Sequence, residues 1–183
     1  MYETGDIVVW DGWPGHVGMV YKGGNSETTS VIHARSGKNF YIEPNQQNQS
    51  GYISYLLEFE CAVFRPPLNN RADKLAKQNT LIAYADLIRQ TAVYGLYRAF
   101  RLAISSSHFG PLAQARLNKY QQRLAGPANG KFVTTVTCSE AIILCYQLTF
   151  SQADKCFIKL DAAHAMPRTL AEWLVKNDWA TVG

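Results

Sequence analysis

Cys138 is the residue of this sequence whose surroundings best suit a nucleophile. It stands in Thr137-Cys138-Ser139-Glu140, between a β-branched run and an apolar helical pattern. Thr137 followed three residues later by Glu140 is the pattern of a capping box, which predicts a helix beginning at Cys138. The backbone N–H groups and the dipole at a helix start stabilise an anion, so we expect them to lower the pKa of this thiol. The alternative is that Cys138 is only a small buried residue at a helix start.

The other three cysteines lack this setting. Cys61 lies in a strand-like run, Cys145 lies inside an apolar helical run, and Cys156 has no capping signal. No Cys-x-x-Cys pair occurs, which argues against a zinc ribbon or a thioredoxin motif. His108 and His164 have no metal-ligand partner at a usual spacing. We therefore expect reduced thiols, no metal and no cofactor.

Two histidines are candidates for a base. His16 opens one β-rich run and His33 lies near the end of the next. If residues 23–26 form a hairpin loop, the two residue numbers of every directly opposed pair add up to 49. His16 then lies opposite His33. Opposed residues have Cβ atoms about 5 Å apart on one face of a sheet, so one imidazole would orient the other. A register shift of one residue would break the pair, leaving two half-exposed sheet histidines.

The elements that must position these residues fall into three sections. The first section, 2–67, is typical of short strands separated by turns, and Pro66-Pro67 ends it. Its expected strands cover 6–10, 16–22, 27–35, 40–42, 53–57 and 61–65.

The second section, 69–126, has apolar residues at helical spacing, which predicts helices over 75–88, 96–104 and 111–124. The third section, 131–183, predicts a strand over 131–136, the Cys138 helix to about residue 148, a short strand at 158–160 and a closing helix over 169–176. We predict an α+β fold in one domain, 1–183. Five or six antiparallel strands would pack on the Cys138 helix, with 69–126 as a helical insertion.

Composition excludes several classes of protein. A chain of 183 residues, 47% hydrophobic and 17% charged, is too short for a multidomain machine and too apolar to be intrinsically disordered. No apolar run reaches the roughly 18–20 residues of a membrane helix. The start, Met1–Asp6, lacks the basic and apolar regions of a secretory signal. We therefore expect no transmembrane segment and a protein that is cytoplasmic as made.

Charge is unevenly distributed along the chain. Residues 65–131 carry a net charge of +9 and the remainder −5. Such a segment attracts anionic polymers or lipids, and we expect Arg98, Arg101, Arg116 and Lys119 to steer an anionic substrate. The alternative is a helical face that is merely solvated.

The order of these motifs resembles the circularly permuted branch of the NlpC/P60 papain-like superfamily. That branch includes YiiX/YaeF-type proteins and lecithin:retinol acyltransferase-like enzymes, in which the histidine strands precede the cysteine helix. The matching stretches are Gly5–Val9, His16–Val20, Val31–Ala34, Cys61–Pro66, Thr137–Glu140 and Met166–Leu170, within residues 5–67 and 131–175. The helical middle, 69–126, has no match.

The resemblance implies roles for individual residues. Cys138 matches the nucleophile, His16 the base, and His33 the polar residue that orients the base. It also implies a papain-like sheet packed on the cysteine helix, a thioester acyl-enzyme, and an oxyanion held at the helix start formed by Thr137, Ser139 and Glu140. We expect a peptide or acyl substrate and no nucleic-acid partner.

The substrate class follows from the same resemblance. Enzymes of the NlpC/P60 type typically cut peptide bonds in the stem peptides of bacterial cell walls, whereas the acyltransferase-like branch acts on lipid esters. We expect a cell-wall amidase, because no apolar anchor is evident. Without a leader, such an enzyme would need a specialised secretion system to reach the cell wall. It would then act as an antibacterial toxin, with an immunity protein or a secretion protein as its partner. The alternatives are a lipid hydrolase, a cytosolic amidase, and a binding module that keeps the papain-like core without catalysis.

Overall fold

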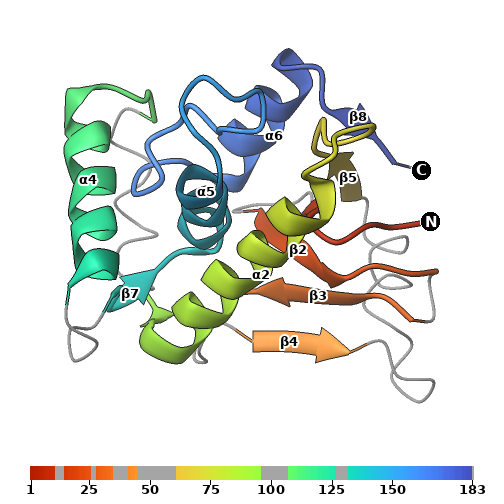
Figure 1. Cartoon of the computed structure of the whole chain (residues 1–183), viewed down its shortest axis with the longest axis horizontal. Helices are drawn as coiled ribbons and strands as arrows, with labels where there is room; N and C mark the ends of the chain where they lie inside the picture. Colours follow the sequence, from red (N-terminus) through yellow and green to blue (C-terminus); the bar gives the residue numbers. More distant parts are fainter. Residues whose placement is uncertain are drawn as a thin grey trace.

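The fold is α+β, as the sequence predicts. The computed structural model describes residues 1–10, 15–25, 28–34, 41–44, 61–95, 107–126 and 132–182. In these residues, six strands form one antiparallel sheet in the order β4-β3-β2-β1-β5-β8, with helices packed on it (Figure 1). The strands are β1 (Ile7–Trp10), β2 (His16–Lys22), β3 (Ser30–His33), β4 (Tyr41–Pro44), β5 (Cys61–Arg65) and β8 (Ala180–Thr181). The strand expected at 53–57 lies outside the described residues.

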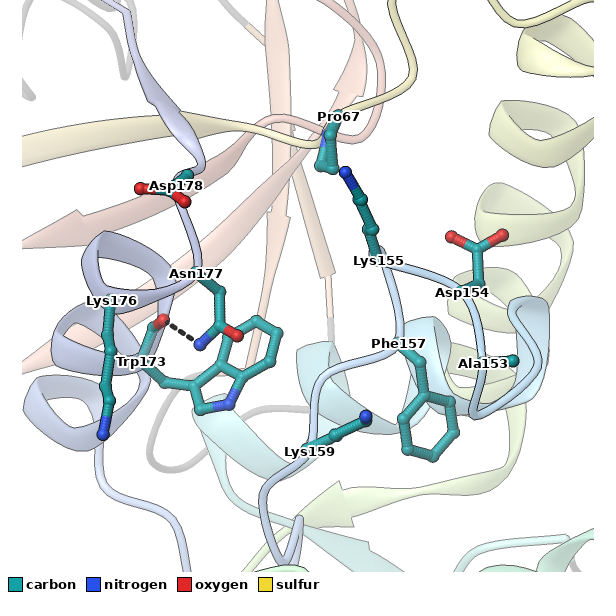
Figure 2. A pocket seen from close by; sticks show the side chains of 10 residues that line it. All are labelled: Pro67, Ala153, Asp154, Lys155, Phe157, Lys159, Trp173, Lys176, Asn177 and Asp178. Atoms are coloured by element: carbon teal, nitrogen blue, oxygen red, sulfur yellow. Dashed lines mark hydrogen bonds between the residues drawn. The ribbon is translucent and has the colours of Figure 1, made fainter.

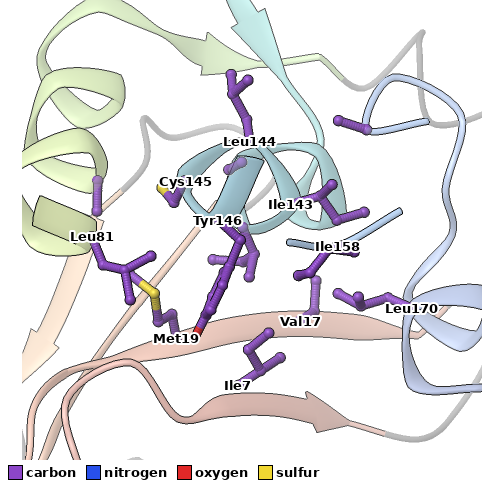
Figure 3. Close-up of a cluster of buried hydrophobic side chains, with 14 of the residues drawn as sticks. Ile7, Val17, Met19, Leu81, Ile143, Leu144, Cys145, Tyr146, Ile158 and Leu170 are labelled. Atoms are coloured by element: carbon purple, nitrogen blue, oxygen red, sulfur yellow. The ribbon is translucent and has the colours of Figure 1, made fainter. Parts of the chain in front are cut away.

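Helix α5 (Cys138–Thr149) lies at the centre of the molecule. Every residue of this helix except Leu148 is buried, because it packs on the sheet on one side and on other helices around it. Figure 3 shows Ile7, Val17 and Met19 of the sheet reaching toward α5, where they meet Leu81 and Tyr146. This contact fixes the start of α5 relative to β2.

Three further helices are described: α2 (Lys74–Thr91), α4 (Pro111–Ala125) and α6 (Pro167–Lys176). Two of them begin with a proline at the first turn, where the missing N–H costs no hydrogen bond. Helix α2 buries Leu81, Ala85 and Ile88 against α5. The helical middle section is therefore part of the main core at α2. The helix expected over 96–104 lies outside the described residues.

A short parallel pair joins the middle section to the third section. Strand β6 (Val93–Tyr94) follows α2 directly and pairs with β7 (Thr135–Val136), which leads into α5. The sequence predicts a longer strand over 131–136 and none at 93–94. Strand β6 has only two residues, which is too short for an alternating hydrophobic pattern to be recognised in the sequence. Its pairing with β7 alone defines it as a strand. Residues 158–160 form an isolated bridge, His108 with Leu160, and no longer strand.

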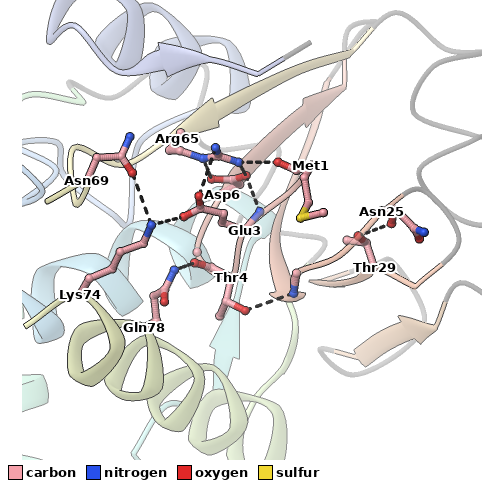
Figure 4. Close-up of polar contacts among 12 residues, drawn as sticks. Met1, Glu3, Thr4, Asp6, Asn25, Thr29, Arg65, Asn69, Lys74 and Gln78 are labelled. Carbon is pink, nitrogen blue, oxygen red and sulfur yellow. Dashed lines mark hydrogen bonds and ion pairs between the residues drawn. The ribbon is translucent and has the colours of Figure 1, made fainter.

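The N-terminal segment is tied to its neighbours by a polar network (Figure 4). Asp6 is fully buried and accepts two hydrogen bonds from the Arg65 guanidinium, at 3.0 and 2.8 Å. Glu3 pairs with Lys74 of α2, and the Gln78 side chain donates to the Thr4 carbonyl at 2.8 Å. These contacts hold the entry to β1 against both β5 and α2.

The hairpin of β2 and β3 forms, but its register differs from the expected one. Gly18 lies opposite His33 and Val20 opposite Val31, and an irregularity between Val20 and Lys22 shifts the pairing further. His16 is therefore not directly opposite His33. Asn25 shapes a longer turn than expected, accepting hydrogen bonds from residues 28 and 29, so β3 begins only at residue 30.

Candidate functional site

The start of α5 carries the capping box that the sequence predicts. The Thr137 hydroxyl accepts a hydrogen bond from the Glu140 backbone N–H at 3.2 Å, and the Thr137 N–H donates to the Glu140 carboxylate at 3.4 Å. Both residues are buried, and the Tyr120 hydroxyl also donates to Glu140, at 3.4 Å. Cys138 is consequently held as the first residue of the helix.

Removing the cap should loosen this helix start. We expect Thr137→Ala to lower the free energy of unfolding by about 1 kcal/mol, because the Glu140 N–H loses its acceptor. Thr137→Ser keeps the hydroxyl and should retain most of that stability. Chemical denaturation of the two variants measures the difference. Equal midpoints for Thr137→Ala and the unmodified protein would contradict the role assigned to the cap.

The Cys138 side chain lies against the first residues of β2. It is 5% exposed, and its sulfur is approached by the backbone N–H groups of Val17, Ser139 and Cys138 itself. Because the nitrogen of Val17 is bonded to the carbonyl carbon of His16, the thiol sits at the peptide that joins these two residues. The fold thus brings the cysteine next to the backbone of the predicted base, across more than 120 residues of sequence.

The two predicted histidines are in contact. His16 Nε2 and His33 Nδ1 are 2.8 Å apart, and the two rings meet edge to face with centroids 4.9 Å apart. The shift of register by two residues keeps both side chains on the same face, and diagonal neighbours on a sheet remain within reach of long side chains. The pairing of the imidazoles is therefore correct although the expected register is wrong.

Trp10 is a third member of this cluster that the sequence reasoning did not identify. It lies opposite His16 in the β1–β2 pairing, with ring centroids 5.1 Å from His16 and 6.1 Å from His33. Trp10 and His33 are both buried, so the indole helps to shield His33 from water, whereas His16 is half-buried. Its position at the end of the first predicted strand was the available signal.

Burial dominates the protonation of the thiols. Burial raises the pKa of Cys138 to about 11, while the N–H groups of Val17, Ser139 and Cys138 act in the lowering direction. The expected lowering by the helix start is therefore outweighed by the loss of hydration. Burial likewise raises the pKa of Cys145, and it raises that of Cys156 to about 12. Cys138 is protonated at neutral pH in the resting protein.

Alkylation follows the fraction of thiolate, which gives a direct test of this state. In the native protein, iodoacetamide labelling of Cys138 should rise about tenfold per pH unit from pH 7 to about pH 10, since the folded pKa is near 11. In the denatured chain, the rate should level off above the ordinary thiol pKa of about 8.5. Peptide mass mapping of the labelled sites measures both. A native rate that is already maximal at pH 7 would mean that Cys138 rests as a thiolate.

The loop between α5 and α6 adds residues that the sequence reasoning left out. Asp161 is buried and pairs with Arg116 and with His164, whose Nδ1 lies 2.7 Å from the carboxylate. Further along this loop, the Ala165 carbonyl accepts a hydrogen bond from the buried Ser139 hydroxyl. Ser139 therefore faces the protein, so its backbone N–H is the group that it offers to the site. The Asp–x–x–His spacing was the local signal for the Asp161–His164 contact.

The residues expected to steer substrate are only partly described. Arg98 and Arg101 lie outside the described residues. Arg116 is bound to Asp161, which neutralises much of its charge, whereas Lys119 is exposed on α4. Steering by this segment stays a prediction.

Among the residues that the structure describes, no cluster of three metal-ligating side chains is present. Across the same residues, no helix combines the length and the apolar character needed to cross a membrane.

Comparison of the chain with protein-family models, with curated proteins and with solved structures finds no match.

Proposed function

We propose that this protein is a cysteine hydrolase of amide bonds that acts on the stem peptides of bacterial cell walls. One observation carries the proposal: Cys138, at the start of a capped helix, lies against the peptide that joins His16 to Val17, and His16 contacts His33. A thiol, an imidazole base and an orienting group in that order form a nucleophilic site. The substrate class rests on the resemblance to permuted NlpC/P60 enzymes.

In the proposed mechanism, the His16 imidazole approaches the thiol around the end of β2. Side chains alternate along β2, so Val17 packs toward α5 while His16 and His33 lie with Trp10 toward the other face. In the middle of a strand the sheet would separate these groups. His16 is the first residue of β2, so the proposed approach to Cys138 passes around that end of the strand. Catalytic hydrogen bonds commonly tighten only when substrate binds.

The proposed reaction begins from a neutral thiol. In the reactive tautomer, His16 Nε2–H donates to His33 Nδ1, and His16 Nδ1 takes the proton from Cys138 as the sulfur attacks the amide carbonyl. Proton transfer coupled to attack suits a thiol whose pKa is about 11. The protonated His16 then gives its proton to the leaving amine as the carbon–nitrogen bond breaks, which leaves a thioester on Cys138.

The helix start stabilises the charge that develops during attack. The backbone N–H groups of Val17, Ser139 and Cys138 lie near the sulfur and act to lower its pKa, and we assign the Cys138 N–H to the oxyanion. Such a donor typically contributes a factor of about 10²–10³ to the rate. Water, activated by His16, then attacks the thioester carbonyl, releases the acid product and restores the Cys138 thiol.

Digestion of purified cell-wall muropeptides tests the function. We expect two products whose masses add up to the substrate plus one water, with the cut at an amide bond of the peptide stem. Intact muropeptides after prolonged incubation, or hydrolysis of lipid esters in their place, would contradict the proposal. Trapping of an acyl group on Cys138, read by protein mass, identifies the covalent intermediate.

A further inference from the structure

A pocket lined by aromatic and cationic residues lies at the opposite end of α5 from Cys138. Its volume is about 390 Å³, which is within the usual range for small-ligand sites. The loop 151–160, which follows α5, forms one wall, and the C-terminal end of α6 forms the other. Helix α5 has twelve residues, so about 17 Å of helix separates its two ends. The pocket is therefore distinct from the proposed catalytic site.

The two walls differ in chemistry. Figure 2 shows Trp173 and Asn177 on one side of the pocket, and Phe157, Lys155 and Lys159 on the other. Both lysines are exposed, and in the described part of the chain neither is in an ion pair. One wall thus presents a flat apolar ring and the other presents positive charge.

The acidic residues of the pocket do not cancel this charge. Asp154 accepts hydrogen bonds from the Arg71 guanidinium at 3.1 and 2.9 Å, so its carboxylate already has a cationic partner. Asp178 is the other acid of the lining, and Lys176 stands near it on the rim. The pocket as a whole therefore favours an anion.

The aromatic wall is held in place before any ligand binds. Trp173 is half-buried and packs edge to face on the buried Trp179, with centroids 6.3 Å apart. The Asn177 side chain donates to the Trp173 carbonyl at 2.8 Å. On the opposite wall, Phe157 is held in the same way by Phe109, with ring centroids 5.3 Å apart. Preorganised rings of this kind lose little conformational entropy when a ligand packs on them.

We propose that this pocket binds a saccharide unit of the wall polymer together with a carboxylate of the peptide attached to it, and so holds the polymer while Cys138 acts on its peptides. The apolar C–H face of a sugar ring packs on the Trp173 indole, and a carboxylate carried by the chain meets Lys155 and Lys159. The choice of polymer rests on the proposed function. A linear acidic peptide supplies charge but no ring face for Trp173, which is why a saccharide is favoured.

Binding to the polymer can be measured without cleavage. Sedimentation of Cys138→Ala protein with purified, peptide-bearing cell-wall glycan should give saturable binding that weakens as salt rises. The double variant Lys155→Glu/Lys159→Glu should bind at least tenfold more weakly. A matched control, Lys22→Glu/Arg168→Glu, changes net charge equally at exposed basic residues outside the pocket and should lose less than twofold. Equal losses of binding in the two double variants would mean that net charge alone accounts for the effect, and would overturn the proposal.

The aromatic wall is tested separately. Trp173→Ala should weaken polymer binding about tenfold, while Trp173→Phe should retain most of it. If Trp173→Ala does not fold, the lysine variants still decide the question. Displacement of the polymer by poly-glutamate at equal charge concentration would show a simple charge site, against the saccharide assignment.

The two proposals fail in different ways. In the active protein, the lysine double variant should hydrolyse a small soluble muropeptide at the unmodified rate and lose activity only on the polymer. Absence of muropeptide hydrolysis with intact polymer binding would overturn the proposed function and leave the saccharide site. Normal hydrolysis without polymer binding would do the reverse.

Discussion

Replacing Cys138 with alanine is expected to lower muropeptide hydrolysis about 10⁴- to 10⁶-fold, as loss of a nucleophile does in related mechanisms. Without the sulfur no thioester forms, and only substrate binding at the helix start remains. Cys138→Ser should be nearly as inactive, because a serine hydroxyl is a far weaker acid than a thiol. Initial rates from product masses measure the loss.

The same helix offers a matched control for this substitution. Cys145 is fully buried two turns further along α5. Cys145→Ala and Cys138→Ala should each cost about 1 kcal/mol of unfolding free energy, since each removes one buried sulfur. Cys145→Ala should nevertheless retain activity. Comparable inactivation by both variants would mean that α5 needs its packing rather than a nucleophile, and would contradict the proposed chemistry.

Replacing His16 with alanine is expected to lower kcat about 10²- to 10⁴-fold, because the Cys138 proton then has no acceptor in the site. Added imidazole should restore part of the rate in this variant, since a small base can enter the space left by the side chain. The unmodified protein should lose activity as pH falls below neutrality, where an imidazole base becomes protonated. Rescue and the pH profile both report base chemistry, which a purely structural residue would not affect.

His33 acts through His16 and should therefore matter less. His33→Gln keeps an acceptor for His16 Nε2 and should retain more activity than His33→Ala, while both should exceed His16→Ala. His108→Ala is a suitable control, because His108 pairs with Leu160 in a different part of the fold. Equal losses in the His16 and His33 variants would contradict the division into base and orienting residue.

Much of the fold was predictable because its signals are local. Pro111 begins a helix where the sequence predicts one, α6 begins at Pro167, two residues before its predicted start, and the antiparallel hairpin of β2 and β3 forms between two β-rich runs. The exact register was not predictable, since the irregularity between Val20 and Lys22 and the turn at Asn25 depend on contacts beyond the hairpin. One of these contacts is the bridge between Tyr2 and Gly24.

The protonation of Cys138 shows the limit of local reasoning about a site. The capping box spans only four residues, so the sequence was sufficient to place Cys138 at a helix start. Its pKa depends instead on how completely α5 is enclosed by the sheet, α2 and α6, and that burial outweighs the N–H groups of the helix start.

The sequence was sufficient to predict the cap of α5 and to identify the cysteine and the two histidines as candidates for the chemistry. Each of these predictions depends only on neighbours within one helical turn or one strand. Tertiary structure decided the contacts that make a site of them. It brought the Cys138 sulfur to the peptide between His16 and Val17, packed both imidazoles beside Trp10, and placed Lys155 and Lys159 across from Trp173. These groups are far apart along the chain, and only the packing of α5 and α6 on one sheet determines their distances.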